Sequence, residues 1–295
     1  FPNPNDIQHA PLNKLSVTAF KDYIACPYRF WLKHVMKLHV AEEGNTELDA
    51  KLFGSFVHSV LQRFGENKSV NSSSNAESIE KSLFRDLDRL VEEQLGSMVS
   101  GKIRVQIELS RYRLREFAKR QALSAASGWK IVCSERKANK VLEVDGSPFK
   151  VRGVIDRIDV HEDGRIRVLD YKTGSTSPNA AHFNKSDSQW IDYQLPLYRS
   201  LLTEIKELDD YNTSEGNISL GYFKVGDQEA SSGIDLLNLT DEAMASVDGA
   251  IELTIQSILN CEYNEQPTEP APKYSDTYSW ICQDDSVVEE SNDDG

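Results

Sequence analysis

VRGVIDRIDVHEDGRIRVLDYKTG, residues 151–174, sets acidic and basic side chains inside an otherwise apolar pattern. Two runs rich in valine and isoleucine flank Glu162-Asp163-Gly164, and a turn that carries a glycine between such runs predicts a β-hairpin. Because side chains alternate between the two faces of a strand, each strand has one largely apolar face that we expect to point into the core. The residues of these two faces are Val154, Asp156, Ile158 and Val160, and Ile166, Val168, Asp170 and Lys172.

The register of the hairpin follows from these faces. Both apolar faces lie on one side of the sheet only if facing residues have an even sum of numbers, which a three-residue turn supplies. Asp156 then faces Asp170, and Lys172 lies one step further along the same face. Directly opposed side chains of an antiparallel pair are about 5 Å apart at Cβ. Two carboxylates that close repel each other and lose hydration, and a shared divalent cation would relieve both costs.

The same pattern permits a plain structural interpretation. Asp156 could pair with Arg157 or Arg152, and Asp170 with Lys172, because short motifs of this kind often match by chance. The register argument and the motifs described below favour metal binding instead. Carboxylates hold a hard cation, which polarises a phosphoryl oxygen and lowers the pKa of a bound water. Glu135, on the preceding predicted strand, is either a third carboxylate near the metal or a solvent-facing strand residue.

Composition limits the class of protein. The chain has 295 residues, 39% of them hydrophobic, and no apolar run approaches the roughly 20 residues of a membrane helix, so we expect no membrane partner. Four scattered cysteines without a signal pattern indicate the reducing cytoplasm. A net charge of −14 repels nucleic acid, so a local basic groove or a partner module would have to supply affinity for DNA. The missing initiator Met suggests a segment of a longer chain.

The order of expected elements indicates an α/β fold, a mixed sheet that carries an N-terminal helical segment. Apolar periodicity predicts helices over 19–24, 26–38, 52–64, 79–91, 107–128, 188–204 and 240–258. Strands are expected over 130–135, 140–144 and 218–225, besides the hairpin. Pro196 lies inside one of these helices and predicts a kink or an early break.

Five motifs, in this order along the chain, resemble those of the RecB/AddB-like nucleases of the PD-(D/E)XK superfamily. They are LSVTAFKDYIACPYRF at 15–30, GSFVH at 54–58, GVIDR at 153–157, DYKTG at 170–174 and QLPLY at 194–198. The resemblance implies a restriction-endonuclease-like fold, with a mixed central sheet flanked by helices. It implies an extended arm over 1–14, a nuclease domain over 15–282 and an acidic disordered tail over 283–295. Within the domain, a helical insertion would cover about 65–128 and the catalytic sheet about 129–226.

The resemblance also implies roles for single residues. The metal ligands would be His58, Asp156, Asp170 and the backbone carbonyl of Tyr171. Lys172 would be the catalytic lysine, and Gln194 and Tyr198 would line the site, where they contact DNA or position the lysine. Without the resemblance, His58 reads as a partly buried histidine bonded to a backbone carbonyl, and Gln194 and Tyr198 as an ordinary amphipathic pair.

One feature departs from that family. Some of its members carry an iron–sulfur cluster on one N-terminal cysteine and a C-terminal C-x2-C-x5-C run. Cys26 fits the first position, but the run is replaced by Lys273, Asp276 and Cys282. Two thiolates out of four do not hold such a cluster, so we predict that no intact iron–sulfur cluster forms. We expect aromatic packing of Tyr28, Phe30 and Trp280 to join the two ends instead.

The leading functional prediction is a Mg²⁺- or Mn²⁺-dependent deoxyribonuclease, with exonuclease action favoured over endonuclease action. It would serve double-strand-break repair with a helicase partner or as part of a longer chain, because no Walker A sequence gives this chain a motor. The alternative is a catalytically inactive DNA-binding or scaffold module of the same fold. A third class is hydrolysis of some other phosphate. Arg152, Arg157, Arg165 and Arg167 could face a polyanion, or Arg165 and Arg167 could form a solvated face.

Overall fold

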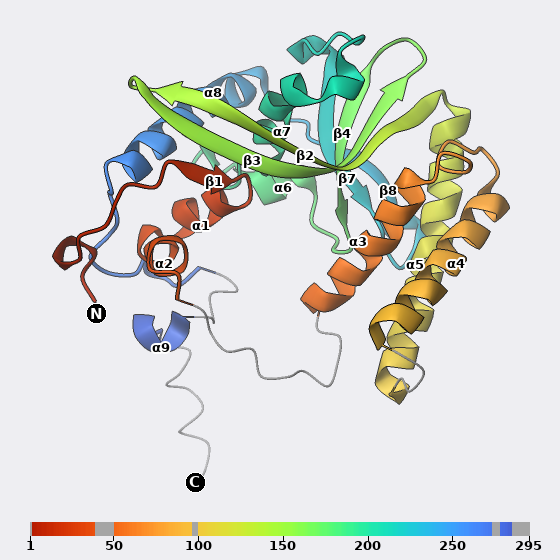
Figure 1. Ribbon diagram of the computed structural model, residues 1–295, viewed down its shortest axis with the longest axis horizontal. Coiled ribbons are helices and arrows are strands. Elements are labelled where there is room, and N and C mark those ends of the chain that lie inside the picture. The colour runs from red at the N-terminus through yellow and green to blue at the C-terminus, as the bar shows by residue number, and fades with distance from the viewer. Residues whose placement is uncertain (1, 39–49, 96–99, 273–277, 285–295) are drawn as a thin grey trace.

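The computed structural model describes residues 2–38, 50–95, 100–272 and 278–284, and a six-stranded mixed sheet forms its centre (Figure 1). The sheet order is β1-β3-β4-β7-β8, and β2 pairs with the other edge of β3. β1 and β4 run parallel to β3 and β7, respectively, and the remaining pairs are antiparallel. The strands are β1 Lys14–Ser16, β2 Trp129–Val144, β3 Ser147–His161, β4 Ile166–Lys172, β7 Ile218–Lys224 and β8 Gly233–Leu236. A separate hairpin pairs β5 Phe183–Asn184 with β6 Gln189–Trp190.

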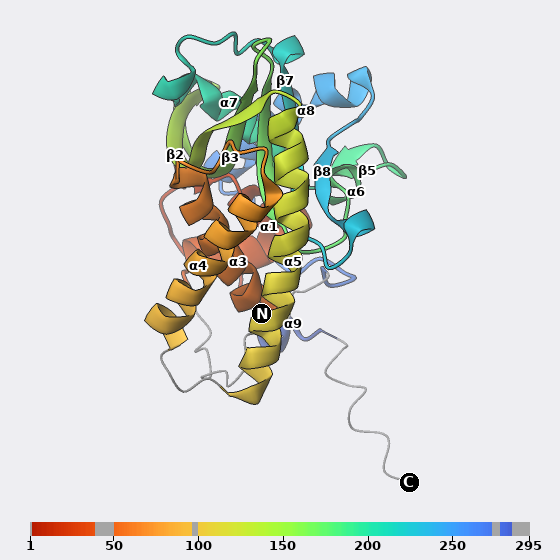
Figure 2. The ribbon, with the colours of Figure 1, turned by 90° about the vertical axis from the view of Figure 1, so that its right-hand side faces the viewer.

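Helices cover both faces of this sheet and enclose two cores. The helices are α1 Ala19–Ala25, α2 Pro27–Phe30, α3 Ala50–Glu66, α4 Ala76–Leu95, α5 Gly101–Ala126, α6 Pro178–His182, α7 Gln194–Leu201, α8 Asp241–Leu259 and α9 Ser279–Cys282, with a π-helix at Trp31–Val35. Short 3-10 turns occupy Pro4–Asp6, Leu202–Glu204, Lys206–Leu208, Glu215–Asn217 and Glu229–Ser231. One core joins α1, α2, α7 and α8 to the sheet, and the other joins α3, α4 and α5. Figure 2 shows these last three helices side by side, facing the viewer.

The predicted fold class, an α/β mixed sheet flanked by helices with helices at the N-terminal end, is confirmed. The hairpin register is also as the alternation predicts. Ile158 faces Val168 and Arg157 faces Leu169. The residue numbers of both pairs have the same even sum, and continuing this register by one residue places Asp156 opposite Asp170. Gly164 adopts a φ of +91°, which explains the glycine in the turn.

The expected face of β3 is wrong for Val154, which is more than a third exposed. Ile155 and Ile158 both lie in the first core, so the strand exchanges its faces between them. β2 does the same beside this point: Cys133 and Ala138 lie in that core, although their parity differs. Glu135, between them, has a φ of +47°, and such a left-handed residue breaks strand alternation.

Two helical expectations also change. α7 begins at Gln194, and Trp190 belongs to β6, so the helix expected over 188–204 is shorter than its periodicity indicates. Pro196 is the third residue of α7 and produces no break, since the first N–H groups of a helix have no partner within it.

The two strands expected over 130–135 and 140–144 form one strand, β2, with an irregularity between Ile131 and Cys133.

The two ends of the described chain meet through polar contacts. Arg29 forms a buried ion pair with Asp284, and the Tyr278 hydroxyl donates to the Leu38 carbonyl at 2.8 Å. The aromatic packing expected of Trp280 is wrong, because that side chain is 84% exposed. Cys26 and Cys282 are buried free cysteines. Lys273, Asp276 and the tail from 285 to 295 lie outside the described residues, and the cluster prediction stays a prediction.

Candidate active site

Three elements bring ionisable side chains to one cavity of about 440 Å³. α3 contributes Gly54, His58 and Gln62 to its lining, and β2 and β3 contribute Glu135 and Asp156. α3 lies there because its apolar stripe, from Phe56 to Phe64, packs into the second core and leaves the neighbouring face of the helix open. One ligand atom each from His58, Glu135 and Asp156 lies within 4.8 Å of the other two.

His58 contacts both strands of the hairpin. Its Nε2 donates to the backbone carbonyl of Tyr171 at 2.9 Å, and its Nδ1 lies 3.4 Å from Oδ2 of Asp156. Burial lowers the pKa of His58, against the Asp170 charge and the bond to Tyr171, which raise it. In the neutral ring the Nδ1 lone pair therefore points at a carboxylate oxygen, and a cation or a proton is needed between the two.

Asp156 is buried, and its Oδ2 accepts the backbone N–H of Tyr171 at 2.8 Å. Burial raises the pKa of this carboxyl well above its ordinary value, and the charges of Asp170 and Glu135 raise it further. The bond from Tyr171 and the charge of Lys172 act in the opposite direction but do not outweigh burial. The carboxyl is thus costly to ionise unless a positive charge joins it.

Glu135, for which the sequence allowed two positions, lies on the side of β2 that faces the candidate site. It is partly buried and lies with His58 and Asp156 rather than on the solvent side of β2. Burial raises its pKa, and the charges of Asp170 and Glu66 add to that effect. The strained backbone at this residue directs a third carboxylate toward the site, a feature that recurs at functional positions.

Asp170 and Lys172 form a second group on β4. Lys172 Nζ lies 2.6 Å from Oδ2 of Asp170, and Gln194 Nε2 donates to Oδ1 at 2.8 Å. Burial alone would lower the pKa of Lys172, but the Asp170 charge and hydrogen bond outweigh it and raise the pKa. The ammonium therefore stays charged. Asp170 lies outside the close group of His58, Glu135 and Asp156, to which its charge couples it.

Gln194 and Tyr198 hold this second group in place. Besides its bond to Asp170, Gln194 Nε2 donates to the Tyr198 hydroxyl at 2.8 Å, and that hydroxyl donates to the Val154 carbonyl at 2.7 Å. Both side chains are buried, so they connect α7 to Asp170 and β3. The sequence did not single out Asp192, whose Oδ1 accepts the N–H of Gln194 at 2.8 Å. Its signal was an acid just before a helix start.

Two of the four arginines that could face a polyanion, Arg157 and Arg167, are buried. Arg157 is only 1% exposed, and its guanidinium makes a bidentate pair with Asp159. Arg167 also binds Asp159, at 2.7 Å, and stacks on Trp129. Both are buried because α5 covers this face of the hairpin, which the alternation alone had left to solvent. Neither guanidinium group therefore lies at the surface, where a polyanion would bind. Arg165 remains exposed and pairs with Asp163.

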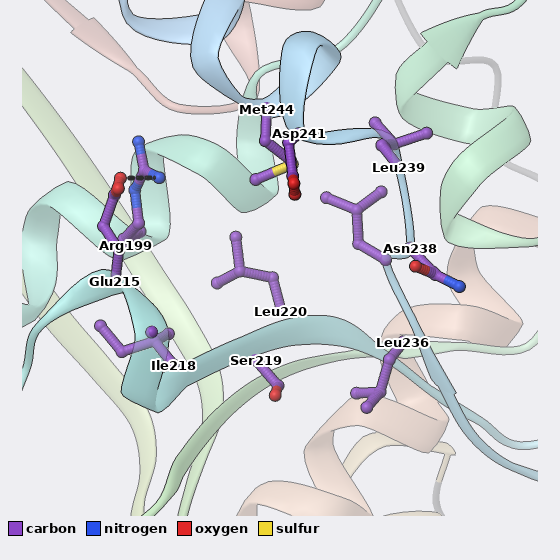
Figure 3. A pocket seen from close by; sticks show the side chains of 12 residues that line it. Arg199, Glu215, Ile218, Ser219, Leu220, Leu236, Asn238, Leu239, Asp241 and Met244 are labelled. Atoms are coloured by element: carbon purple, nitrogen blue, oxygen red, sulfur yellow. Dashed lines mark ion pairs between the residues drawn. The ribbon is translucent and has the colours of Figure 1, made fainter.

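A separate cavity of about 350 Å³ lies between β7, β8 and α8 (Figure 3). Its walls carry Ile218, Leu220 and Met244, and the ion pair of Arg199 with Glu215 stands at one side. It contains none of the predicted site residues. Three of the candidate metal ligands, His58, Glu135 and Asp156, line the cavity beside α3 instead.

Comparison with known families agrees with this geometry. The PD-(D/E)XK nuclease superfamily matches residues 14–283. The chain belongs to that superfamily. An ATP-dependent helicase/deoxyribonuclease subunit of Carboxydothermus hydrogenoformans is 28% identical over 214 residues, or 67% of this chain and 19% of that protein. The protein of the same name from Streptococcus agalactiae is 23% identical over 66% of this chain and 17% of that protein.

These relatives support the RecB/AddB-like resemblance. The matched region spans only about a fifth of their length. The solved structure titled "Crystal structure of SSO0001" is similar at a TM-score of 0.33 and 12% identity, covering 96% of this chain and 89% of that one. Among the described helices, none combines the length and apolar character needed to cross a bilayer.

Proposed function

We propose that this nuclease-superfamily chain is a metal-dependent deoxyribonuclease that hydrolyses phosphodiester bonds. The observation that carries the proposal is the pair of buried carboxylates, Asp156 and Asp170. Possible metal ligands, His58 and Glu135, lie beside Asp156, and the Lys172 ammonium lies beside Asp170. Carboxyl groups in such a setting are found where function repays their cost.

The side chains around Asp156 fit a hard divalent cation. His58, Glu135 and Asp156 would hold it, with Asp170 and the Tyr171 carbonyl as the further ligands that the family resemblance implies. The raised pKa values of Asp156 and Glu135 express the same need for positive charge. When bound, Mg²⁺ or Mn²⁺ would polarise the phosphoryl oxygen and lower the pKa of a water.

The remaining residues orient and neutralise. Lys172 stays protonated beside Asp170, so it stabilises negative charge that develops on the phosphate rather than removing a proton. Gln194 fixes Oδ1 of Asp170 and thereby the side from which Asp170 meets its partners. Tyr198 anchors Gln194 to β3. Together these contacts hold the site within the small tolerance that catalysis requires.

The wider role rests on the relatives. Their name joins a helicase and a deoxyribonuclease, so we propose DNA as the substrate and a helicase subunit or helicase segment as the partner in break repair. Exonuclease action fits a nuclease that follows a helicase along an end. The strongly acidic composition supports a partner, because this chain repels free DNA at long range.

Cleavage of linear and circular DNA, single- and double-stranded, tests the proposal with Mg²⁺ or Mn²⁺ present. Cutting confined to linear substrates indicates exonuclease action. Asp170→Ala and Lys172→Ala should reduce the rate by at least about a hundredfold, whereas Asp163→Asn, on the exposed turn of the same hairpin, should not. A wild type that cuts nothing even with a helicase partner supplied, or variants that cut as fast, would leave the scaffold alternative.

A further inference from the structure

Lys172 has a second neighbour besides Asp170. Its Nζ lies 5.3 Å from the centre of the Tyr222 ring, on the ring face. Tyr222 reaches that place because β4 and β7 are parallel and pair Asp170 with Tyr222, which puts the ring on the same face as Asp170 and Lys172. A cation over an aromatic face is attracted to it, more strongly when both are shielded from water.

The Tyr222 ring is fixed at its far end by a buried histidine. The Tyr222 hydroxyl lies 2.8 Å from Nε2 of His182, and Nδ1 of His182 lies 2.8 Å from the backbone carbonyl of Asp192. A carbonyl only accepts, so Nδ1 carries the proton and Nε2 accepts the tyrosine O–H. Burial lowers the pKa of His182, which keeps the ring neutral and this bonding pattern intact.

These contacts close into a ring that returns to Lys172. Asp192, whose carbonyl holds His182, also accepts the N–H of Gln194 through its side chain, and Gln194 in turn donates to Asp170. Asp170 forms the ion pair with Lys172. The members of this ring of contacts are Lys172, Tyr222, His182, Asp192, Gln194 and Asp170. The sequence signals that marked Asp170, Lys172 and Gln194 gave no indication of Tyr222 or His182.

An ammonium on a lysine needs such support here. A cavity of about 700 Å³ opens beside Lys172 and is lined by Lys21, Asp192 and Tyr222, among others. A lysine side chain has many rotamers, and an open cavity gives it room to turn away from Asp170. The Tyr222 ring forms the wall of the cavity at the ammonium. It therefore restricts the directions that the side chain can take.

We propose that Tyr222 and His182 are positioning residues that hold the Lys172 ammonium beside Asp170 and thereby set the rate of the proposed reaction. The catalytic part of this inference rests on the proposed nuclease function. The placement of the ammonium does not, and can be measured without metal or DNA.

The first measurement is a carbon–proton spectrum of the protein with ¹³C at the lysine ε positions, in which Lys172→Arg assigns the signal. Protons above an aromatic face shift upfield, so the Lys172 signal should lie apart from those of exposed lysines. The shift should be smaller in Tyr222→Phe and in His182→Asn, which remove the two ends of one hydrogen bond. It should vanish in Tyr222→Leu. An unshifted Lys172 signal in the wild type, or a shift that survives Tyr222→Leu, overturns the proposal.

The second measurement is kinetic. Tyr222→Phe and His182→Asn should each lower kcat by about tenfold to a hundredfold and leave KM within about twofold, since the substrate still binds. The kcat of the double variant should be no lower than that of the less active single variant, because both changes break the same bond. Tyr23→Phe, which removes a tyrosine bond to the Glu262 carbonyl, is the matched control and should keep kcat. Unchanged kcat in both single variants, or fully additive losses, contradicts the proposal.

The two measurements separate the failures. A wild type that shows the shifted Lys172 signal but cuts no DNA contradicts the nuclease function and leaves the placement of the ammonium standing. A wild type that cuts DNA but shows no shift contradicts the placement alone. Thermal unfolding of each variant in the absence of metal identifies a loss of rate that comes only from unfolding.

Discussion

The backbone N–H of Tyr171 donates a 2.8 Å hydrogen bond to the side chain of Asp156. The bond joins β4 to β3 just beyond Arg157 and Leu169, the last pair of their ladder, from one residue past Arg157 to two residues past Leu169. A side chain thus replaces the next backbone bond, and the Tyr171 carbonyl turns toward His58. The point where the ladder ends is the point where the acidic groups gather.

Asp156 should make the metal-free protein less stable as the pH rises. Because its folded-state pKa is raised, the unfolded chain releases this proton first, and the free energy of unfolding falls from about pH 4 until the pH passes the folded pKa. Asp156→Asn keeps an acceptor for Tyr171 without the charge. With a chelator present, we expect it to exceed the wild type by about 1–3 kcal/mol near pH 8 and to match it near pH 4.

Urea unfolding at both pH values measures this difference. Asp163→Asn is the control. Hydrogen bonds from Arg165 and His161 lower the pKa of the exposed Asp163 carboxyl, so the contribution of Asp163 to stability should rise with pH and not fall. If the wild type and Asp156→Asn lose the same stability between the two pH values, Asp156 is not a carboxyl whose pKa is raised in the folded state.

Glu135 allows strain and chemistry to be separated. Glu135→Gly and Glu135→Ala both remove the carboxylate, but only glycine is at ease at a φ of +47°. The glycine variant should be about 1 kcal/mol more stable than the alanine variant in urea unfolding. Both should cut DNA more slowly than the wild type. An alanine variant as stable as the glycine variant would show that the backbone there is not strained.

Asp159 should be a structural residue and not a catalytic one. It is fully buried and pairs with both Arg157 and Arg167, so its removal leaves two guanidinium groups without their anion. Asp159→Ala should cost about 3–5 kcal/mol of unfolding free energy, the range for breaking a buried ion pair. Asp163→Ala, at an exposed pair, should cost far less, because solvent screens such a pair. Comparable losses in the two variants would contradict the buried pairing.

The hairpin could be read from sequence because its information is local. Alternation and a three-residue turn fix which residues face each other, and Ile158 does face Val168. His58 lies 113 residues from the Tyr171 carbonyl that it contacts, so only the family resemblance pointed to it. Nothing in a sequence marks the left-handed backbone of Glu135, so alternation alone could not predict on which side of β2 its carboxylate lies.

The arginines show why the remainder could not be predicted. Alternation correctly places Arg157 and Arg167 on the face opposite Ile158, but it does not say what covers that face. Because α5 packs over it, both guanidinium groups turn to Asp159 instead of solvent. The same limit applies to Tyr222, whose position beside Lys172 follows from the parallel pairing of distant strands.

Titration of the chelator-treated protein with Mn²⁺ in a calorimeter tests the central claim most directly. The wild type and Asp163→Asn should bind the metal. At a free Mn²⁺ concentration of about a hundred times the dissociation constant, this binding should stabilise the folded protein by roughly 2.7 kcal/mol. Asp156→Asn should bind far more weakly and gain little. Equal binding by Asp156→Asn and the wild type, or no binding by the wild type, would contradict a metal site built on the buried carboxylates.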